Sequence, residues 1–242
     1  RNRSLEYEVN RNLVKIGKPT DRKDWDMTTP TVNAYYDPQH AEIVFPAGML
    51  QPPMFSASFE DAVNFGAVGR VVGHELTHGF DDEGRKFDAD GSLTDWWTAP
   101  DAKAFEERTA CVRDQYSNYV ALKDPKTGEE VHLNGQLTLG ENVADVGGVR
   151  MSYRAYMKKL QEKGAEAEIG GFNPEQRFFI AYAQSRCENL SDNYARLLAA
   201  TDPHSPGHYR AIGPVVNMPE FWKAFGCHKG QAMVSDNACR VW

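Results

Sequence analysis

Apolar residues recur at helical spacing along several stretches of this chain, and these stretches predict most of its secondary structure. Helices are predicted over residues 60–80, 98–121 and 140–163, because apolar positions three or four residues apart share one helix face. The clearest apolar stripe, in the second stretch, consists of Phe105, Cys111, Val112, Tyr116 and Tyr119. We interpret this stripe as part of the protein core.

Capping residues and turns mark the limits of further elements. Asn173, followed by Pro174, begins a helix, and Pro219 begins a last helix that ends near Phe225. Turns or loops are expected at residues 88–91, 124–128 and 164–171.

Two short strands are predicted near the N-terminus. Tyr35-Tyr36 and the stretch 42–45 contain strand-forming residues, and Asp37-Pro38 form the turn between them. A helix end and a proline-containing loop are expected before them, over residues 1–32. The whole pattern predicts one predominantly helical α+β domain over residues 1–242, with a small β-sheet edge beside the first long helix.

Composition limits the class of protein. The chain has 242 residues, of which 41% are hydrophobic, and its formal net charge is −7 at pH 7. This is typical of a soluble globular domain with a sizeable core, and the negative charge argues against a nucleic-acid partner. We find no apolar run long enough for a membrane span and no signal peptide. Because the chain begins with Arg1-Asn2-Arg3 rather than Met, we expect it to be part of a longer protein.

The most informative local pattern is His74-Glu75-Leu76-Thr77-His78. In a helix, residues four apart lie on the same face, so His74 and His78 can both reach one zinc ion. Glu75 then stands beside them, facing a water molecule on the metal. Because five residues can match by chance, a third ligand is needed to support a zinc site.

A catalytic zinc site requires a third protein ligand and an open position for water. One class of zinc peptidases uses a His that follows a Gly, six residues past the second His, but here no His occurs between His78 and His132. A second class uses a Glu about twenty residues downstream, where this chain has Trp96, Trp97 and Thr98. The remaining option is a Glu on a more distant helix.

Glu141 and Asp145 provide such an option. They are again four residues apart, so one helix presents both carboxylates on one face. One carboxylate can bind zinc while the other accepts the ring N–H of a ligating His. The alternative is two solvated acids at a helix start, where the helix dipole favours them. The apolar residues and glycines around them favour a buried position.

These segments together resemble the neprilysin and endothelin-converting-enzyme family of zinc endopeptidases. The resemblance covers nearly the whole chain, and its segments occur in the same order. They are residues 33–36, 43–53, the His74 motif, 133–135, the Glu141 segment at 140–148, 202–207 and 239–242.

The resemblance implies a thermolysin-like catalytic domain that binds one zinc ion through His74, His78 and Glu141. Glu75 acts as general base, and Asp145 orients His74. The resemblance also implies that His204, held by Asp202, donates a hydrogen bond in the transition state, and that Asn33, Ala34 and Arg210 bind substrate. Asp81, three residues past His78, is a candidate for a further carboxylate behind the ligands. Without the resemblance, His204 and Arg210 would be interpreted as solvated loop residues.

The resemblance also implies a specificity pocket for the substrate residue that follows the cleaved bond. Relatives prefer a large apolar residue there, but this chain has Arg70 and Arg186 at two positions of the lining. Either both arginines point to solvent and the pocket stays apolar, or at least one points inward and accepts an acidic or polar side chain. The positions assigned to this pocket are Met49, Met54, Arg70, Val71, Ser185 and Arg186.

The resemblance also assigns a disulfide partner to each of the four cysteines. It implies a disulfide between Cys111 and Cys239, whereas Cys187 and Cys227 bridge to a helical lobe upstream of this chain. Disulfides form in oxidising compartments, so an extracellular or periplasmic location is expected, either secreted or as the ectodomain of a membrane-anchored protein.

Two other functions remain open. A non-catalytic zinc module that only binds peptide has no need of Glu75, and structural zinc sites are closed by four protein ligands; a fragment that is inactive without its missing lobe is a related possibility. An exopeptidase needs a group that captures a free terminus, and Arg210 is the candidate for it. The sequence favours an endopeptidase acting on oligopeptides.

Overall fold

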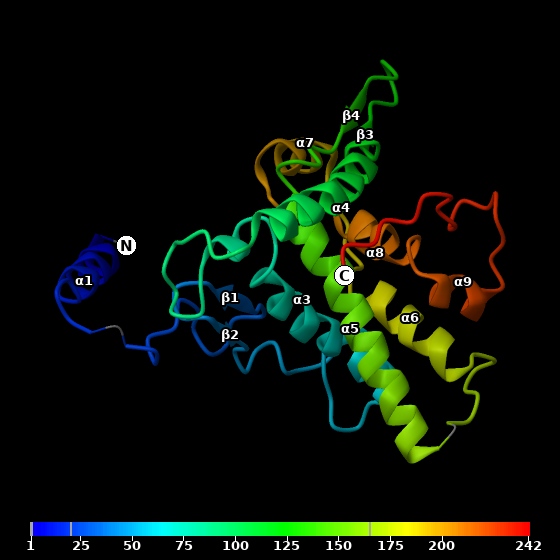
Figure 1. Cartoon of the computed structure of the whole chain (residues 1–242), viewed down its shortest axis with the longest axis horizontal. Helices are drawn as coiled ribbons and strands as arrows, with labels where there is room; N and C mark the ends of the chain where they lie inside the picture. Colours follow the sequence, from blue (N-terminus) through cyan, green and yellow to red (C-terminus); the bar gives the residue numbers. More distant parts are fainter. Residues whose placement is uncertain (1, 20, 165) are drawn as a thin grey trace.

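The computed structural model describes residues 2–19, 21–164 and 166–242. Residues 1 and 20 of the expected N-terminal stretch, and residue 165 of the expected loop at 164–171, lie outside this description. The fold is α+β and predominantly helical, as predicted (Figure 1).

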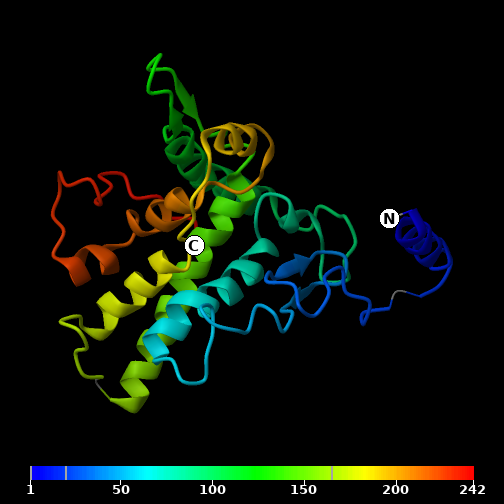
Figure 2. The same ribbon diagram turned by 180° about the vertical axis from the view of Figure 1, so that it is seen from behind.

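Helix α5 (Leu139–Lys163) runs through the middle of the molecule, and α3 (Arg70–His78) packs along it (Figures 1 and 2). α3 continues directly from α2 (Asp61–Asn64) and a π-helical turn, η1 (Phe65–Gly69). The helix predicted at 60–80 is therefore present. Single π-helical turns inside helices often occur beside functional sites, and this one immediately precedes α3.

The first part of the core lies between α5 and the helices that follow it. α6 (Pro174–Gln184) packs against α2 and η1, and α8 (Gly207–Val215) packs against α5. The Asn173 side chain accepts from the Gln176 backbone, and the Gln176 side chain accepts in return from the Asn173 backbone, which explains where α6 begins. Large buried side chains of this core are Tyr153, Tyr156, Phe178, Phe179, Tyr182 and Met218.

Helix α4 (Ala99–Ser117) is shorter than predicted. The expected end near residue 121 is wrong, because β3 (Val120–Lys123) begins there and pairs antiparallel with β4 (Glu130–His132). Tyr119, which fits the helical stripe, instead stacks on Tyr209 with ring centroids 4.3 Å apart. This second two-stranded sheet was not predicted, and it projects at the top of Figure 1.

The predicted N-terminal strands are present as β1 (Tyr35–Asp37) and β2 (Glu42–Val44), with Tyr35 opposite Val44. β1 contacts α3, so the sheet edge lies beside this helix as expected. The remaining elements are α1 (Asn2–Leu13), which has no buried residue and lies apart from the main body, the 3-10 turn η2 (Gly84–Lys86), α7 (Asp192–Thr201), and α9 (Pro219–Phe225) (Figure 1). α7 and α8 were not predicted, whereas α9 was.

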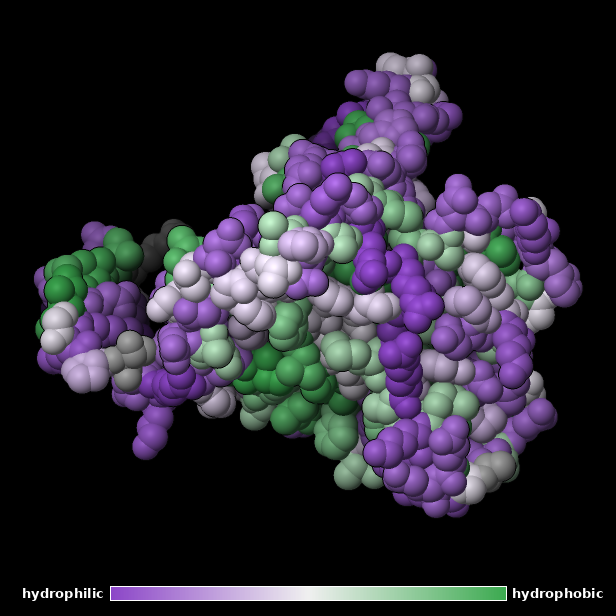
Figure 3. All heavy atoms as spheres, viewed as in Figure 1, coloured by the Kyte–Doolittle hydropathy of each residue, from purple (hydrophilic) through white to green (hydrophobic). Residues whose placement is uncertain are grey.

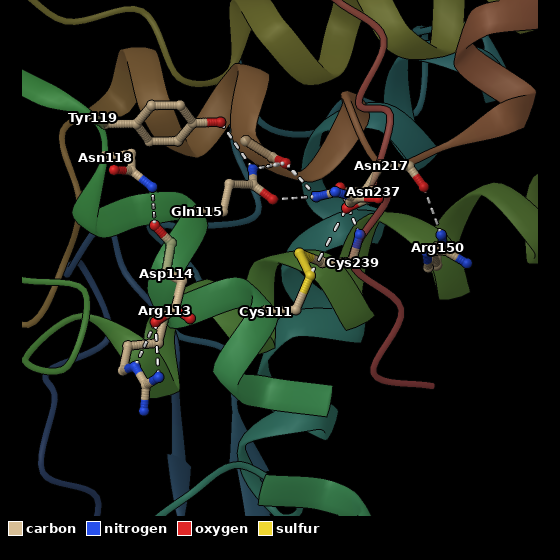
Figure 4. The surroundings of a disulfide bond; sticks show 11 residues. Cys111, Arg113, Asp114, Gln115, Asn118, Tyr119, Arg150, Asn217, Asn237 and Cys239 are labelled. Carbon is tan, nitrogen blue, oxygen red and sulfur yellow. Dashed lines mark hydrogen bonds and ion pairs between the residues drawn. A yellow bond between two sulfur atoms is a disulfide. The ribbon is translucent and has the colours of Figure 1, made fainter. Parts of the chain in front are cut away.

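A disulfide between Cys111 and Cys239 joins α4 to the C-terminal segment (Figure 4). Beside it, the Cys239 backbone N–H donates to Oδ1 of buried Asn217 at 2.8 Å, and Asn217 Nδ2 donates to Gln115 Oε1 at 2.7 Å. The Trp242 ring then packs 5.6 Å from that of Phe105. The chain end is therefore fixed against α4, while Cys187 and Cys227 are free thiols in the structure.

An apolar surface covers the outer side of α3 and the adjoining part of α5 (Figure 3). Its exposed members are Val72, Leu76, Phe80, Met151 and Trp242. Among the described residues, no helix combines the length and the apolar character needed to cross a membrane.

Candidate metal centre and its cleft

Two helices meet at unusually short range to form the site. A methyl group on Gly73 of α3 would lie 2.7 Å from the Gly148 carbonyl oxygen of α5, and one on Gly147 would lie 2.4 Å from Oγ1 of Thr77. Only glycine permits such close backbone approach. The glycines therefore bring the first turns of α5 against the histidines of α3.

Three donor groups converge at this crossing. The Nε2 atoms of His74 and His78 are 3.0 Å apart, and the Glu141 carboxylate lies 3.3 Å from the first and 3.6 Å from the second. Together, these three residues form a group whose ligand atoms all lie within 4.8 Å of one another. The structure thus brings together the three residues that the sequence analysis assigned as zinc ligands.

Carboxylates behind the two rings determine which nitrogen faces the centre. His78 Nδ1 lies 2.6 Å from Asp81, and His74 Nδ1 lies 2.9 Å from Asp145, although this second contact is not well aligned for a hydrogen bond. Protons on both Nδ1 atoms leave both Nε2 lone pairs facing each other and the Glu141 carboxylate. Lone pairs so placed repel unless a proton or a metal ion lies between them. Imidazole nitrogens with a carboxylate suit Zn²⁺, so these residues fit a zinc ion.

The electrostatic field of the site also favours a cation. Burial opposes the charge on His78, but the Asp81 hydrogen bond and the Glu141 charge raise the pKa of His78 to about 9. Burial likewise opposes ionisation of Glu141, yet the hydrogen bond and charge of His74, followed by the charge of Arg210, lower the pKa of Glu141 to about 2. The carboxylate is therefore ionised throughout the physiological range.

Glu75 is buried beside the ligands and lines the same cleft. Among the described residues, its carboxylate has no hydrogen-bond or ion-pair partner, in contrast to Glu141. Burial raises the pKa of Glu75, and the nearby charges of His74 and His78 partly offset this effect. A carboxylate whose pKa moves toward neutrality is suited to accept and return a proton.

Asp145 has more partners than the sequence analysis expected. Its Oδ1 accepts from Arg186 Nη2, and its two oxygens accept from Arg210 at 2.7 and 3.0 Å, in addition to the His74 contact. Burial would raise the pKa of this fully buried carboxyl, but Arg186 and Arg210 hold it well below its usual range. The Asp145–Arg186 pair joins residues 41 positions apart, and no spacing rule could have found it.

Arg210 was expected on a loop, which is wrong: it lies on α8, and its side chain is largely buried. Its Nη2 also lies 3.3 Å from Glu141. The His204 side chain is half-exposed at the rim, with Nδ1 at 2.8 Å from Asp202 and Nε2 at 3.3 Å from Glu141. Its loop is fixed by Ser205, whose buried hydroxyl donates to Asn142 Oδ1.

One cleft of about 550 Å³ is lined by the three candidate ligands and by Glu75, Asp81, His204 and Arg210, whereas Asp145 and Asp202 do not line it. Asn33 and Ala34 line it immediately before β1, as do the apolar residues Met49, Met54 and Val71. Because β2 is the partner of β1 in a two-stranded sheet, the second edge of β1 is unpaired in the described structure. An unpaired strand edge presents backbone donors and acceptors to an added strand.

The pocket residues proposed from the sequence are not all together. Arg70 and Arg186 both line the cleft. Arg70 is buried and the Arg186 side chain is largely buried, so the interpretation that both point to solvent is wrong. Ser185 does not line this cleft: its hydroxyl donates to the Tyr182 carbonyl at 2.7 Å, and the residue faces a separate pocket beside Cys187. The reason is that α6 ends at Gln184, and the following turn directs Ser185 away.

Comparison with known proteins identifies relatives of this arrangement. Residues 33–241 match the sequence profile of peptidase family M13. The chain is 44% identical to an endothelin-converting enzyme homolog of Locusta migratoria over 98% of its length, and 43% identical to neprilysin of Homo sapiens over 99%. It spans only 32% of the length of either relative.

Solved structures agree with this match. The Mycobacterium tuberculosis zinc metalloprotease ZMP1, solved in complex with an inhibitor, superposes with a TM-score of 0.90 at 41% identity, covering 96% of this chain and 35% of that one. PEPO from Lactobacillus rhamnosis superposes with a TM-score of 0.77 at 33% identity, covering 91% of this chain and 32% of that one.

Proposed function

This chain belongs to peptidase family M13, and on that basis we propose that it is a zinc-dependent endopeptidase that hydrolyses peptide bonds of oligopeptides. The observation that carries the proposal is the convergence of His74, His78 and Glu141 beside the unpaired carboxylate of Glu75. A purely structural site would have a fourth protein ligand, whereas this one opens onto a cleft.

The chemistry that zinc supplies at such a site is acidification of a water molecule and polarisation of a carbonyl group. In our proposal Glu75 accepts the proton of the attacking water and then donates it to the leaving amine. Its burial and its lack of a hydrogen-bond partner among the described residues keep the carboxylate available for both transfers.

His204 is proposed to donate a hydrogen bond to the oxygen that becomes negative during the reaction. The support is its position: Asp202 holds Nδ1, and Nε2 points to the Glu141 side of the cleft. Donors placed where charge develops are worth about 100- to 1,000-fold in rate. Asn33 and Ala34 are proposed to pair with the substrate backbone, because they adjoin the unpaired edge of β1.

The wider organisation is also part of the proposal. Residues 1–242 form one catalytic domain, and a further lobe of the same polypeptide is the expected partner. The apolar surface over α3 and α5 supports a covering partner, as does the match to a third of the relatives' length. The disulfide supports an extracellular or periplasmic location.

The test combines metal analysis with cleavage of a quenched-fluorescent peptide. We expect about one zinc ion per chain, loss of cleavage after chelation, and recovery when zinc is restored. His78→Ala should abolish both zinc binding and cleavage, whereas His132→Ala, on the exposed β4 strand, should change neither. Stoichiometric zinc without cleavage of any peptide would contradict the endopeptidase and favour a peptide-binding module.

A further inference from the structure

One end of the cleft carries a positive charge without a partner. Arg70 is buried, with only 6% of its surface exposed. Within the part of the chain that the structure describes, its guanidinium has no hydrogen bond or ion pair, and its buried Nε has no acceptor. Burial of an unpaired charge is strongly unfavourable, so the unpaired guanidinium of Arg70 calls for a functional explanation.

Two neighbouring carboxylates, Asp145 and Glu141, are engaged with other partners and form no ion pair with Arg70. Asp145 accepts from Arg186 and Arg210 and lies against His74. Glu141 faces the two histidine rings and Arg210. Glu75 lines the same cleft without a partner, but it forms no ion pair with Arg70 in the described structure. The Arg70 guanidinium is therefore not paired with any of the three carboxylates.

Arg70 remains cationic at neutral pH. Burial, followed by the nearby charge of Arg186, lowers the pKa of Arg70 to about 9, which is still above the physiological range. Arg186 also retains donor capacity, since its buried Nε has no acceptor among the described residues.

The location relates this charge to the proposed reaction. Arg70 lies one helical turn before His74 and thus on the same side of α3. Both residues line the cleft, together with an apolar cluster formed by Ala34, Met49 and Val71. An apolar wall with a guanidinium beside it suits a ligand that has methylene groups and ends in a carboxylate.

We propose that Arg70, assisted by Arg186, binds a carboxylate of the substrate at this end of the cleft, so that peptides with an acidic group next to the cleaved bond are preferred. The inference rests on the proposed peptidase function. The carboxylate can belong to a Glu or Asp side chain, or to the C-terminus of a short peptide, and the experiment separates these sources.

The experiment uses matched quenched-fluorescent peptides in which one residue is Glu, Gln or Leu. In one set this is the residue just before the cleaved bond, and in the other set it is the residue just after it. Each peptide is prepared with a free C-terminal acid and as an amide, and mass spectrometry locates the cleavage. Because charge-assisted hydrogen bonds are among the strong ones, we expect kcat/KM for Glu to exceed that for Gln by about 10-fold or more. A preference for free acids over amides instead identifies the terminal carboxylate as the source.

Variants assign the preference to the guanidinium. Arg70→Met should bring the Glu-to-Gln ratio near one, while Arg70→Lys should retain part of it. The matched control, Arg154→Met, removes the same charge from the exposed outer side of α5 and should leave the ratio as in the parent. If Arg70→Met does not fold, the parent ratios still decide: rejection of Glu in favour of Leu, with no preference for free acids, overturns the proposal.

A binding measurement separates this inference from the peptidase function. Calorimetry with acetylated, amidated Glu and Gln peptides on the metal-free protein should give about 10-fold tighter binding of Glu, dependent on Arg70. This result without any cleavage by the zinc-loaded protein would sink the peptidase function and uphold the carboxylate pocket. Cleavage of the Glu and Gln peptides with equal kcat/KM, together with equal binding of the two peptides, would overturn the carboxylate pocket and uphold the peptidase function.

Discussion

Gly73 and Gly148 meet backbone to backbone where α3 crosses α5. A methyl group built on Gly73 would lie 2.7 Å from the carbonyl oxygen of Gly148 and 2.9 Å from its Cα. Because backbone atoms rather than flexible side-chain ends form the contact, neither helix can yield locally. The separation of the two histidines from Glu141 is therefore set by two residues that bind nothing themselves.

Gly73→Ala should consequently weaken the site although it favours helix formation. The added methyl pushes the helices apart, and overpacking of this kind typically costs about 1–3 kcal/mol, against a gain of about 1 kcal/mol in helix propensity. We expect a lower free energy of unfolding and reduced zinc affinity. Urea denaturation and zinc titration measure the two effects. A more stable variant with unchanged zinc affinity would show that the helix crossing accommodates the added methyl group.

Asp145→Asn tests whether one carboxylate serves both the metal site and the arginines. We expect zinc affinity to fall by about 10- to 100-fold, the usual effect of losing a group behind a ligating His. Because Arg186 and Arg210 lose a buried counter-charge, stability should fall too, by roughly 3–5 kcal/mol.

Asp81→Asn is the matched comparison for Asp145. Asp81 supports His78 but forms no ion pair with an arginine in the described structure, and its Oδ1 accepts from the backbone of Glu83 and Gly84, as an amide oxygen also can. Zinc affinity should fall in both variants, and stability mainly in Asp145→Asn. Equal stability losses would contradict the assigned network.

His204→Ala should reduce turnover without affecting the fold. The side chain is half-exposed and touches Asp202 and the rim of the cleft, so zinc content and Tm should match those of the parent. We expect kcat to fall by about 100- to 1,000-fold with little change in KM, the pattern of a donor that acts in the transition state. A rise in KM alone would assign His204 to substrate binding.

The disulfide should contribute substantially to stability, because it closes a long loop with a sequence separation of 128. Replacing Cys111 and Cys239 with Ser should cost about 2–4 kcal/mol, measured by chemical denaturation. Cys187→Ser is the control, since that thiol is free and exposed. Peptide mapping without reduction should recover the Cys111–Cys239 pair, and finding both thiols free would contradict it.

Local spacing predicted much of the site but not its connections. The four-residue intervals from His74 to His78 and from Glu141 to Asp145 place each pair on one helix face, and the structure has both helices. The link from Asp145 to Arg186 depends on how α5 lies against the turn that follows α6, which no local pattern encodes.

The same limit explains the errors in the fold. The apolar stripe of α4 continues through Tyr119, so periodicity alone could not reveal that the chain leaves the helix at Ser117 and that Tyr119 stacks on Tyr209. Arg210 was assigned to a loop, although it lies on α8. The helix that begins at Gly207 lacks a side-chain cap, which is the usual sequence signal.

The central claim is that Glu75 transfers the proton while other residues hold the metal. Glu75→Gln keeps the size of the side chain and leaves His74, His78 and Glu141 in place, but it removes the base. Zinc content by elemental analysis should equal that of the parent, and kcat on a quenched-fluorescent peptide should fall by at least about 100-fold. A variant that retains zinc and cleaves at close to the parental rate would contradict the account.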